Sequence, residues 1–479
     1  MSKKHLTVKP HIFTFYHIFS KVFFLLVFPF LQQIFLNPES IWQRITYTIL
    51  NTLLIVFVGI VICLEYKQIS YIQHTDHIVC KKGFFHHNEI FLPIREITVI
   101  SVTSSIILWL VHCNRVYVSS STCFRVRRAE LFTGNTAARK IINYTTGLVQ
   151  KKPVYKSRLL APFFMSLTQS NTLTGTLALS VILNRLSILL GERASNLVAD
   201  SLSFFQNLLA GIVPPTLAYV AGIIFAGFLF GLINQIISNA NFTCLYSKKH
   251  LYVYKGVLKK SILCVNRALV NGVLIKQSLL MCIAGLYTLS VLYTGIKEDK
   301  NSGVYIPLTF GNRLNRYVRT IVPVEEPCNV IRPRKEAVKS YLYAPLIFLL
   351  ITAVVFLRLS ESFSTSFISR FTAVVLIPFG VLWLWFRLLA HKHCGIAYGN
   401  KSIRVNYYSR LNLMSAVIYK SSVTKAEIRQ NPWQQIFKKC HLILYVCDKK
   451  KITIKVKHLP LKNTVDFVES FIASRTLEP

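Results

Sequence analysis

The chain has 479 residues, of which 52% are hydrophobic and 16% are charged, and its 56 lysines and arginines against 19 acids give a net charge of +37. This composition is too apolar for ordinary soluble domains, and it excludes a disordered or low-complexity chain. The excess of positive charge predicts an anionic partner close to the surface. The eleven cysteines form no C-x-x-C pair, so we interpret them as buried thiols in a reducing compartment.

Six apolar stretches, grouped in three pairs, approach the roughly 20 residues that a membrane-spanning helix needs. In chain order, the predicted spans are Phe13 to Leu36, Ile41 to Leu64, Phe163 to Leu183, Leu208 to Ile237, Tyr341 to Leu357 and Phe371 to Ala390. The third is the weakest, because Ser, Thr, Asn and Gln interrupt it. No small-residue cleavage site follows the first, so we expect it to remain in the mature chain rather than act as a signal peptide.

The distribution of cations predicts the orientation of these spans, because lysine and arginine resist translocation across the membrane. The three loops within the pairs hold only four of the 56 Lys and Arg residues, namely Arg185, Arg193, Arg358 and Arg370. The segments between the pairs carry most of the others. We therefore expect a multi-pass protein of the cell (cytoplasmic) membrane, with both termini and three soluble domains in the cytoplasm.

The segment after each span pair follows one pattern, which predicts a threefold internal repeat. The matching positions are Ile78, Leu251 and Ile403; Gly83, Gly256 and Tyr408; Arg95, Arg267 and Lys420; and, on a later apolar strand, Val116, Leu289 and Leu442. Short alternating runs such as IRVNYY predict antiparallel strands, and Gly83 and Gly256 predict turns with positive φ or a bulge. A closing helix is predicted at PLKNTVDFVESFIAS, with an apolar stripe at Val465, Val468, Phe471 and Ile472.

The third copy contains KAEIRQNPWQQIFKKCHLILYV, the first contains KKGFF and LPIREI, and the second contains KGVLKK. These strings resemble the second type of bacterial pleckstrin-homology-like domain, found in YdbT-like membrane proteins that alternate helix pairs with such domains. The second copy departs from the family pattern because it lacks the proline after Gln-Ser. The resemblance implies a fold but no established catalytic residue, and it leaves the ligand open.

The predicted fold class is a membrane α-helical protein with six spans in three hairpins, plus three cytoplasmic α+β pleckstrin-homology-like domains, each an antiparallel sheet with a C-terminal helix. The predicted boundaries are 1–66, 159–238 and 341–390 for the transmembrane hairpins, and 67–158, 239–340 and 391–479 for the domains.

The sequence contains no recognisable catalytic motif. It has no phosphate-binding loop, no nucleophile elbow and no His or Cys spacing of a known zinc site. Acids are too few for general acid and base pairs to be built readily. We therefore expect a protein that is not an enzyme, with no catalytic residues, no cofactor and no bound metal.

Basic residues at the ends of the predicted strands are the candidate contacts for anionic lipid or for a protein partner. They are Lys81, Lys82, Arg95, Lys248, Lys249, Lys259, Lys260, Arg267, Arg404, Arg410, Lys420, Lys438 and Lys439. An ordinary solvated face explains these cations equally well. The expected partners are anionic lipids of the inner leaflet and a smaller membrane protein with a pleckstrin-homology-like domain; homo-oligomers stay open, and no nucleic acid is expected.

The expected function is that of a non-enzymatic binding or scaffold protein at the membrane surface. Three tethered domains would act together, so that modest contacts add up through a high effective concentration. The alternative is a transporter or lipid-handling channel through the helix bundle. A substrate cavity at the midplane would favour the channel, whereas helices packed tightly by side chains would favour the scaffold.

Overall fold

The structure, a computed structural model, describes residues 6–23, 41–74, 76–83, 88–121, 126–146, 152–157, 163, 215–293, 303–322, 329–360, 376–399, 401–446 and 452–476. Its contacts divide the chain into two compact units. Unit 1 comprises residues 1–156, 241–270 and 294–302, and unit 2 comprises residues 157–240, 271–293 and 303–479.

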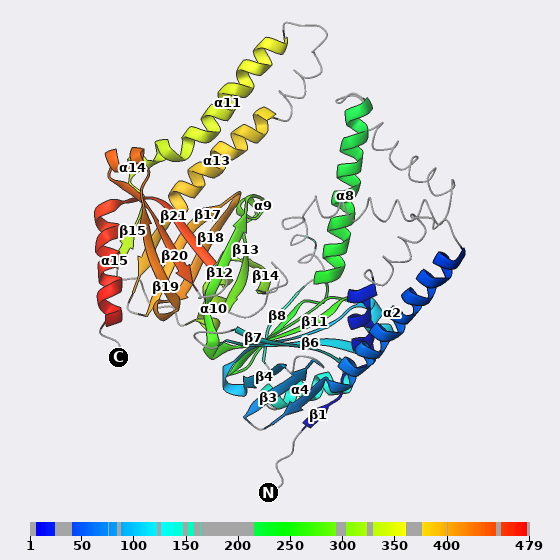
Figure 1. Cartoon of the computed structure of the whole chain (residues 1–479). Coiled ribbons are helices and arrows are strands. Elements are labelled where there is room, and N and C mark those ends of the chain that lie inside the picture. Colours follow the sequence, from blue (N-terminus) through cyan, green and yellow to red (C-terminus); the bar gives the residue numbers. More distant parts are fainter. Residues whose placement is uncertain are drawn as a thin grey trace. The chain divides into compact units, whose positions relative to one another are not determined.

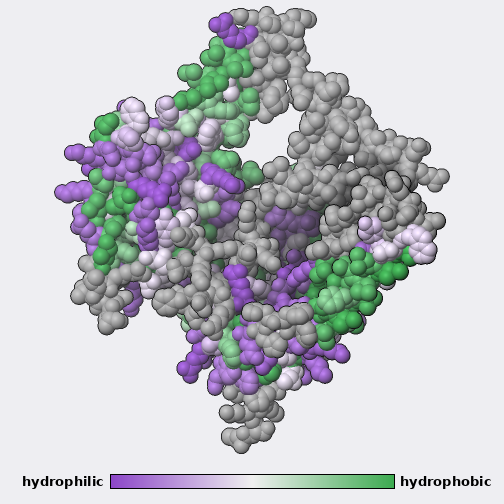
Figure 2. All heavy atoms as spheres, in the orientation of Figure 1, coloured by the Kyte–Doolittle hydropathy of each residue, from purple (hydrophilic) through white to green (hydrophobic). Residues whose placement is uncertain are grey.

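The prediction of six membrane spans was wrong. Among the described residues, two helices are long and apolar enough to cross a membrane, Ile45–Gln68 and Lys335–Arg358. These segments form most of α2 (Ile41–Gln68) and α11 (Val338–Ser360), and Figure 2 shows hydrophobic residues along both helices. The rest of the described chain consists mainly of four antiparallel sheets, an architecture that suits soluble domains better than a six-span membrane protein.

The other predicted spans have individual outcomes. Helix α13 (Ile377–His393) has 17 described residues and is not one of the two candidates, and residues 371–375 of the predicted span lie outside the described residues. Helix α8 (Pro215–Asn239) covers most of the fourth predicted span but is not one of the two candidates. The first predicted span is described as helical only for residues 13–23, and the third lies outside the described residues except for Phe163. Hydropathy alone cannot separate a span from an apolar helix that packs on a neighbour.

The secondary structure follows the same order three times. The first copy comprises β1 (Leu6–Val8), β2 (Ser70–Gln73), β3 (His77–Lys82), β4 (Asn88–Pro93), the 3₁₀ helix η1 (Ile94–Glu96), β5 (Ile97–Ser104), α3 (Ile106–Leu110), β6 (Cys113–Ser121), β7 (Val126–Gly134) and α4 (Asn135–Thr146). The second comprises β8 (Lys152–Lys156), β9 (Thr243–Tyr246), β10 (His250–Lys255), β11 (Lys260–Asn266), η2 (Arg267–Leu269), β12 (Val270–Ser278), α9 (Leu279–Ile283), β13 (Leu286–Tyr293), β14 (Val304–Phe310) and α10 (Gly311–Ile321). The third comprises β15 (Asn329–Ile331), β16 (Gly395–Tyr398), β17 (Ser402–Ser409), β18 (Asn412–Tyr419), η6 (Lys420–Ser422), β19 (Val423–Arg429), α14 (Pro432–Ile436), β20 (Lys439–Val446), β21 (Ile452–Pro460) and α15 (Leu461–Thr476).

The sheets do not follow the boundaries of the copies (Figure 1). Unit 1 contains a four-stranded sheet, β1-β2-β3-β4, and a seven-stranded sheet, β7-β6-β5-β11-β10-β9-β8. Unit 2 contains a seven-stranded sheet, β14-β13-β12-β18-β17-β16-β15, and a three-stranded sheet, β19-β20-β21. In each seven-stranded sheet, the strand that follows the 3₁₀ helix of one copy pairs with the fourth strand of the next copy.

Alternating residues of the strands build the core of each unit. In β17, Ile403 and Val405 are buried and Arg404 between them is exposed, as the alternating pattern predicts. The turn prediction for the two glycines is also confirmed, because Gly83 and Gly256 have φ values of 102° and 90°.

Helix α15 covers the core of the last copy through a different stripe from the predicted one. Phe467 and Phe471, four residues apart, are buried against strands of the third copy, and Val468 is partly buried beside them. Ile472 is 56% exposed, so its predicted place in the core was wrong. A register set by i and i+4 turns this residue toward solvent.

Candidate functional site

The apolar helix α2 and one end of the sheets meet in unit 1. Helix α2 ends at Gln68 and β2 begins at Ser70, which lies opposite Lys81 in β3. Near the end of α2, the hydroxyl of Tyr66 donates a hydrogen bond of 3.1 Å to the carbonyl of Pro10. We call this end of unit 1, with the adjoining ends of β3 and β4 at Lys82 and Asn88, its helix end.

The short helix α3 lies at the same helix end. The Ser105 hydroxyl caps it by accepting a hydrogen bond of 3.4 Å from the Leu108 amide. Leu108 is buried against Phe132, and the ring of Phe13 lies 5.4 Å from the Phe132 ring. Because Phe13 follows closely on Pro10, which Tyr66 of α2 contacts, α3 is fixed near the foot of α2.

Most of α3 is exposed although it carries no polar residue. Its sequence is IILWL, and only Leu108 is buried. The exposed fractions are 50% for Ile106, 64% for Ile107, 58% for Trp109 and 66% for Leu110. The β10–β11 turn adds the exposed Val257 and Leu258 beside β5, because Lys260 pairs with Ser104 just before α3. A contiguous exposed apolar patch of this kind indicates a binding partner that is itself apolar.

Unit 2 carries two further helices of the same kind, α9 and α14. In both, as in α3, the third residue is buried, and it is Met281 in α9 and Gln434 in α14. Large apolar side chains on either side are exposed. They are Leu280 and Ile283 of α9, Trp433 and Ile436 of α14, and Phe437 directly after α14.

The three short helices end in the same backbone turn. The second residue after each helix has a positive φ, 52° at His112, 64° at Gly285 and 50° at Lys438. This left-handed conformation is the usual way to end a helix and reverse the chain into the next strand. The repetition of one turn in all three copies means that the short helices project in the same way from their strands.

The foot of α11 defines the helix end of unit 2. The Tyr341 hydroxyl of α11 donates a hydrogen bond of 3.0 Å to the carbonyl of Lys457 in β21. The buried Lys439, just after α14, extends its Nζ to within 3.3 Å of the Glu336 carbonyl, ahead of α11. Leu279 and Cys282 of α9 pack on the cluster that contains Tyr341. Both α9 and α14 therefore lie at the foot of α11.

Helix α14 is fixed by a buried polar network rather than by apolar packing. The Gln434 amide nitrogen lies 3.0 Å from Nε2 of His441 and 3.4 Å from Nδ1 of His458. Burial, together with the positive charges of nearby Lys455 and Lys457, lowers the pKa of His441 to about 4. Burial and then the neighbouring His441 lower the pKa of His458 to about 4. Both imidazoles are therefore neutral at pH 7 and act as hydrogen-bonding groups.

Twelve of the thirteen predicted basic contacts separate into two groups by position. Lys81, Lys82, Lys259, Lys260, Arg410, Lys438 and Lys439 lie at the helix ends. Arg95, Lys248, Lys249, Arg267 and Lys420 lie at the opposite ends of the sheets, on the 3₁₀ helices and the β9–β10 turn, and Arg404 lies within β17. Their role as ligand contacts stays a prediction.

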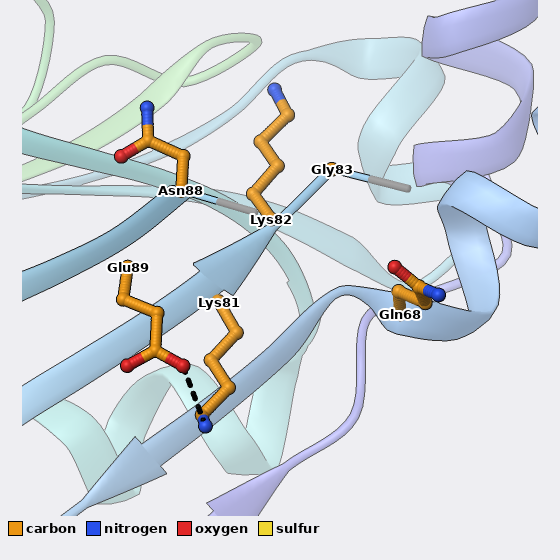
Figure 3. Close-up of a pocket in the computed structure, with 6 residues that line it drawn as sticks. All are labelled: Gln68, Lys81, Lys82, Gly83, Asn88 and Glu89. Carbon is orange, nitrogen blue, oxygen red and sulfur yellow. Dashed lines mark ion pairs between the residues drawn. The ribbon is translucent and has the colours of Figure 1, made fainter. Parts of the chain in front are cut away.

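Three of these cations have partners within the protein. Lys81 forms an ion pair with Glu89 at 2.7 Å, at the edge of a cavity of about 220 Å³ between the ends of β3, β4 and α2 (Figure 3). The Lys82 side chain points away from this pair. Arg267 donates a hydrogen bond of 2.6 Å to the Tyr246 hydroxyl, and Lys439 is only 7% exposed. Lys81, Arg267 and Lys439 therefore already interact with groups of the protein itself.

Sequence reasoning missed the exposed apolar residues of the short helices. A helix of five residues is too short to show a helical period, so its pattern is indistinguishable from the end of a strand. The signal that was present is positional, since SSIILWLVHC, QSLLMCIAGL and NPWQQIFKKC occupy the same place in the three copies.

Comparison with protein-family models, with curated proteins and with solved structures found no match. The resemblance to a pleckstrin-homology-like family therefore stays a prediction. Within the described ranges, no group of three or more His, Cys, Asp or Glu side chains is placed to hold a metal ion. The two candidate spans are mostly exposed, with 11% and 17% of their most apolar windows buried, and they are compatible with association with a membrane.

Proposed function

We propose that the chain is a non-enzymatic binding protein of the membrane surface, and that α3, α9 and α14 hold its sheets against an anionic leaflet. The observation that carries this proposal is the location of the short helices. All three expose large apolar side chains, and they lie at the ends where the apolar helices α2 and α11 meet the sheets. A helix anchored in a membrane would bring these side chains to the interface.

The energetics favour docking at an interface. Each half-exposed large apolar side chain that leaves water contributes roughly 1 kcal/mol, and tryptophan is enriched at the level of the lipid headgroups. Trp109 and Trp433 stand on α3 and α14. Lys82, Lys259, Lys260 and Lys438 at the helix ends each add about 1 kcal/mol next to anionic lipid. The excess of cations supports the cytoplasmic face of the cell membrane as the location.

Close packing between α11 and α13 supports a scaffold rather than a channel. The rings of Phe348 and Phe379 lie 6.0 Å apart, and a Cβ atom added to Gly380 would lie 2.5 Å from Cδ2 of Leu349. The two helices run side by side in Figure 1. Side chains therefore fill the space between them.

The test uses the full chain in lipid nanodiscs, with Trp42, Trp383 and Trp385 replaced by phenylalanine so that Trp109 and Trp433 remain as the reporters. Lipids brominated near the headgroup quench tryptophans that lie in the interface. We expect strong quenching in anionic nanodiscs and a large loss of quenching in neutral ones. Equal, weak quenching in both would overturn the proposal.

Two variants with the same change in charge provide the control. The first replaces Lys82, Lys259, Lys260 and Lys438 with glutamine at the helix ends. The second replaces Arg95, Lys248, Lys249 and Lys420 with glutamine at the opposite ends. We expect only the first to reduce quenching by anionic lipid. If both variants reduced quenching equally, the net charge of the protein rather than the cations at the helix ends would attract the membrane, and the proposal would be wrong.

A further inference from the structure

The chain joins its copies twice through the same strand pairing. Strand β5 of the first copy pairs with β11 of the second, with Val99 opposite Val265. Strand β12 of the second copy pairs with β18 of the third, with Gly272 opposite Ile418. Both pairings are antiparallel.

The two junctions have the same register. Val99 and Gly272 each stand six residues before the residue that precedes the short helix, Ser105 and Ser278. Val265 and Ile418 each stand two residues before the next 3₁₀ helix. Register is strictly specified wherever one face of a sheet is buried, because a shift of one residue would move every side chain of the strand to the opposite face. An identical register at both junctions is therefore a property of the repeat.

Each junction joins two kinds of strand: the strand after a 3₁₀ helix and the fourth strand of a copy. The first copy leaves its fourth strand at the outer position of a sheet, and the last copy leaves its strand after the 3₁₀ helix there. Among the described strands, β4 is the outer strand of its four-stranded sheet, and it corresponds to β11 and β18. Strand β19 is the outer strand of the three-stranded sheet, and it corresponds to β5 and β12. The outer strand at the end of the chain, β19, is therefore of the kind that pairs with the outer strand at its start, β4, as β5 pairs with β11 and β12 with β18.

We propose that β19 of one molecule pairs with β4 of a second copy of this chain, in the antiparallel register of the internal junctions. Counting from Asn431 ahead of α14 and from η1 places Lys425 opposite Leu92, Ala426 opposite Phe91, and Arg429 opposite Asn88. The contact joins the end of one array to the start of the next. It is heterologous, so it extends into a ring or a chain of molecules.

The charges on β19 are compatible with this pairing and limit its strength. Arg429 contacts Glu427 at 2.6 Å and Lys425 contacts it at 3.5 Å, so the acid is already compensated on its own strand. Arg429 of β19 corresponds to Lys276 of β12. Lys276 pairs with Met414 inside a seven-stranded sheet, so a cation at this position is compatible with strand pairing. Charges on an outer strand oppose indiscriminate pairing, so the association is weaker than the internal junctions and reversible.

The experiment mixes two singly substituted, differently tagged full-length chains, one with Ala426→Cys and one with Phe91→Cys. Directly opposed residues of antiparallel strands have Cβ atoms about 4.5 to 5.5 Å apart, close to the separation that a disulfide needs. After mild oxidation with diamide, we expect a mixed-disulfide dimer that carries both tags. Mass spectrometry should place the new bond between positions 426 and 91.

The matched control replaces Phe91→Cys with Ile90→Cys, one residue out of register and on the other face of β4. We expect its mixed-disulfide yield to be about tenfold lower. Equal yields, or no mixed disulfide in either mixture, would overturn the proposal. Unmodified protein supplies an independent measurement, since its mass by light scattering should rise with concentration. A constant monomer mass would also overturn it.

Discussion

Helices α3 and α14 occupy the same place in two copies of the repeat, yet different chemistry holds them. Leu108 fixes α3 by packing on Phe132, whereas Gln434 fixes α14 by hydrogen bonds to His441 and His458. The exposed faces are apolar in both cases. The buried position can therefore be apolar or polar as long as its polar atoms are satisfied, but only the polar version depends on pH.

The largest expected effect is a loss of stability in unit 2 on acidification. The pKa values of His441 and His458 are about 4 in the folded protein, against a usual value of 6.5. Between these values the unfolded chain binds more protons than the folded chain, so stability falls as the pH falls. From pH 7 to pH 5 we expect a loss of about 3 kcal/mol for the two groups together.

Hydrogen exchange at pH 7 and pH 5, compared at equal intrinsic exchange rate, measures this loss in the two units separately. Protection of β20 and β21 in unit 2 should fall more than protection of β6 and β7 in unit 1, where burial also lowers the pKa values of His17 and His250. The variant His441→Gln should show about half of the wild-type dependence on pH. Equal sensitivity of both units to acid would contradict the distinction between α3 and α14.

The next effect is expected from Leu108→Ala in unit 1. The substitution leaves a cavity under α3 where Phe13 and Phe132 now pack. We expect it to cost about 2 kcal/mol, at the low end for a buried leucine, because a short surface helix can settle into the space. Denaturant unfolding monitored in unit 1 tests this value, and Ile107→Ala on the exposed face is the control that should change stability little.

The smallest expected effect concerns the cap of α3. Replacing Ser105 with alanine removes the hydroxyl that accepts from the Leu108 amide, at a cost of about 1 kcal/mol. The loss should appear as faster exchange of the Leu108 amide with the strands of unit 1 unchanged. The variant Ser105→Asp should restore protection, because aspartate is an equally good cap.

The sequence predicted local features of the strands well. The alternation in IRVNYY and the glycines at positions 83 and 256 depend on neighbouring residues alone, and both are present in the structure. The pairing of β5 with β11 was not predicted, because an apolar strand such as ITVISVTS suits any complementary edge and its partner lies more than 150 residues away. The propensity of a segment to form a strand does not indicate which other strand it will pair with.

The candidate site was predicted only in part. Charge counting found Lys81 and Lys439, but it had no means of detecting the ion pair with Glu89 or the burial of Lys439 after its turn. It also placed equal weight on Arg267, which holds Tyr246. The exposed Trp109 and Trp433 depend on the orientation of a single helical turn, which composition does not report.

The sharing of each seven-stranded sheet by two copies has a consequence for how the chain can be divided. A fragment that begins at His391 would keep β16 to β21 but would lose β15 and β12, leaving both edges of the sheet around β17 uncovered. Such uncovered edges invite aggregation. Proteolytic or genetic cuts at the boundaries of the sequence copies should therefore give insoluble pieces, whereas a cut near residue 270, between β11 and β12, would leave each of the four sheets whole.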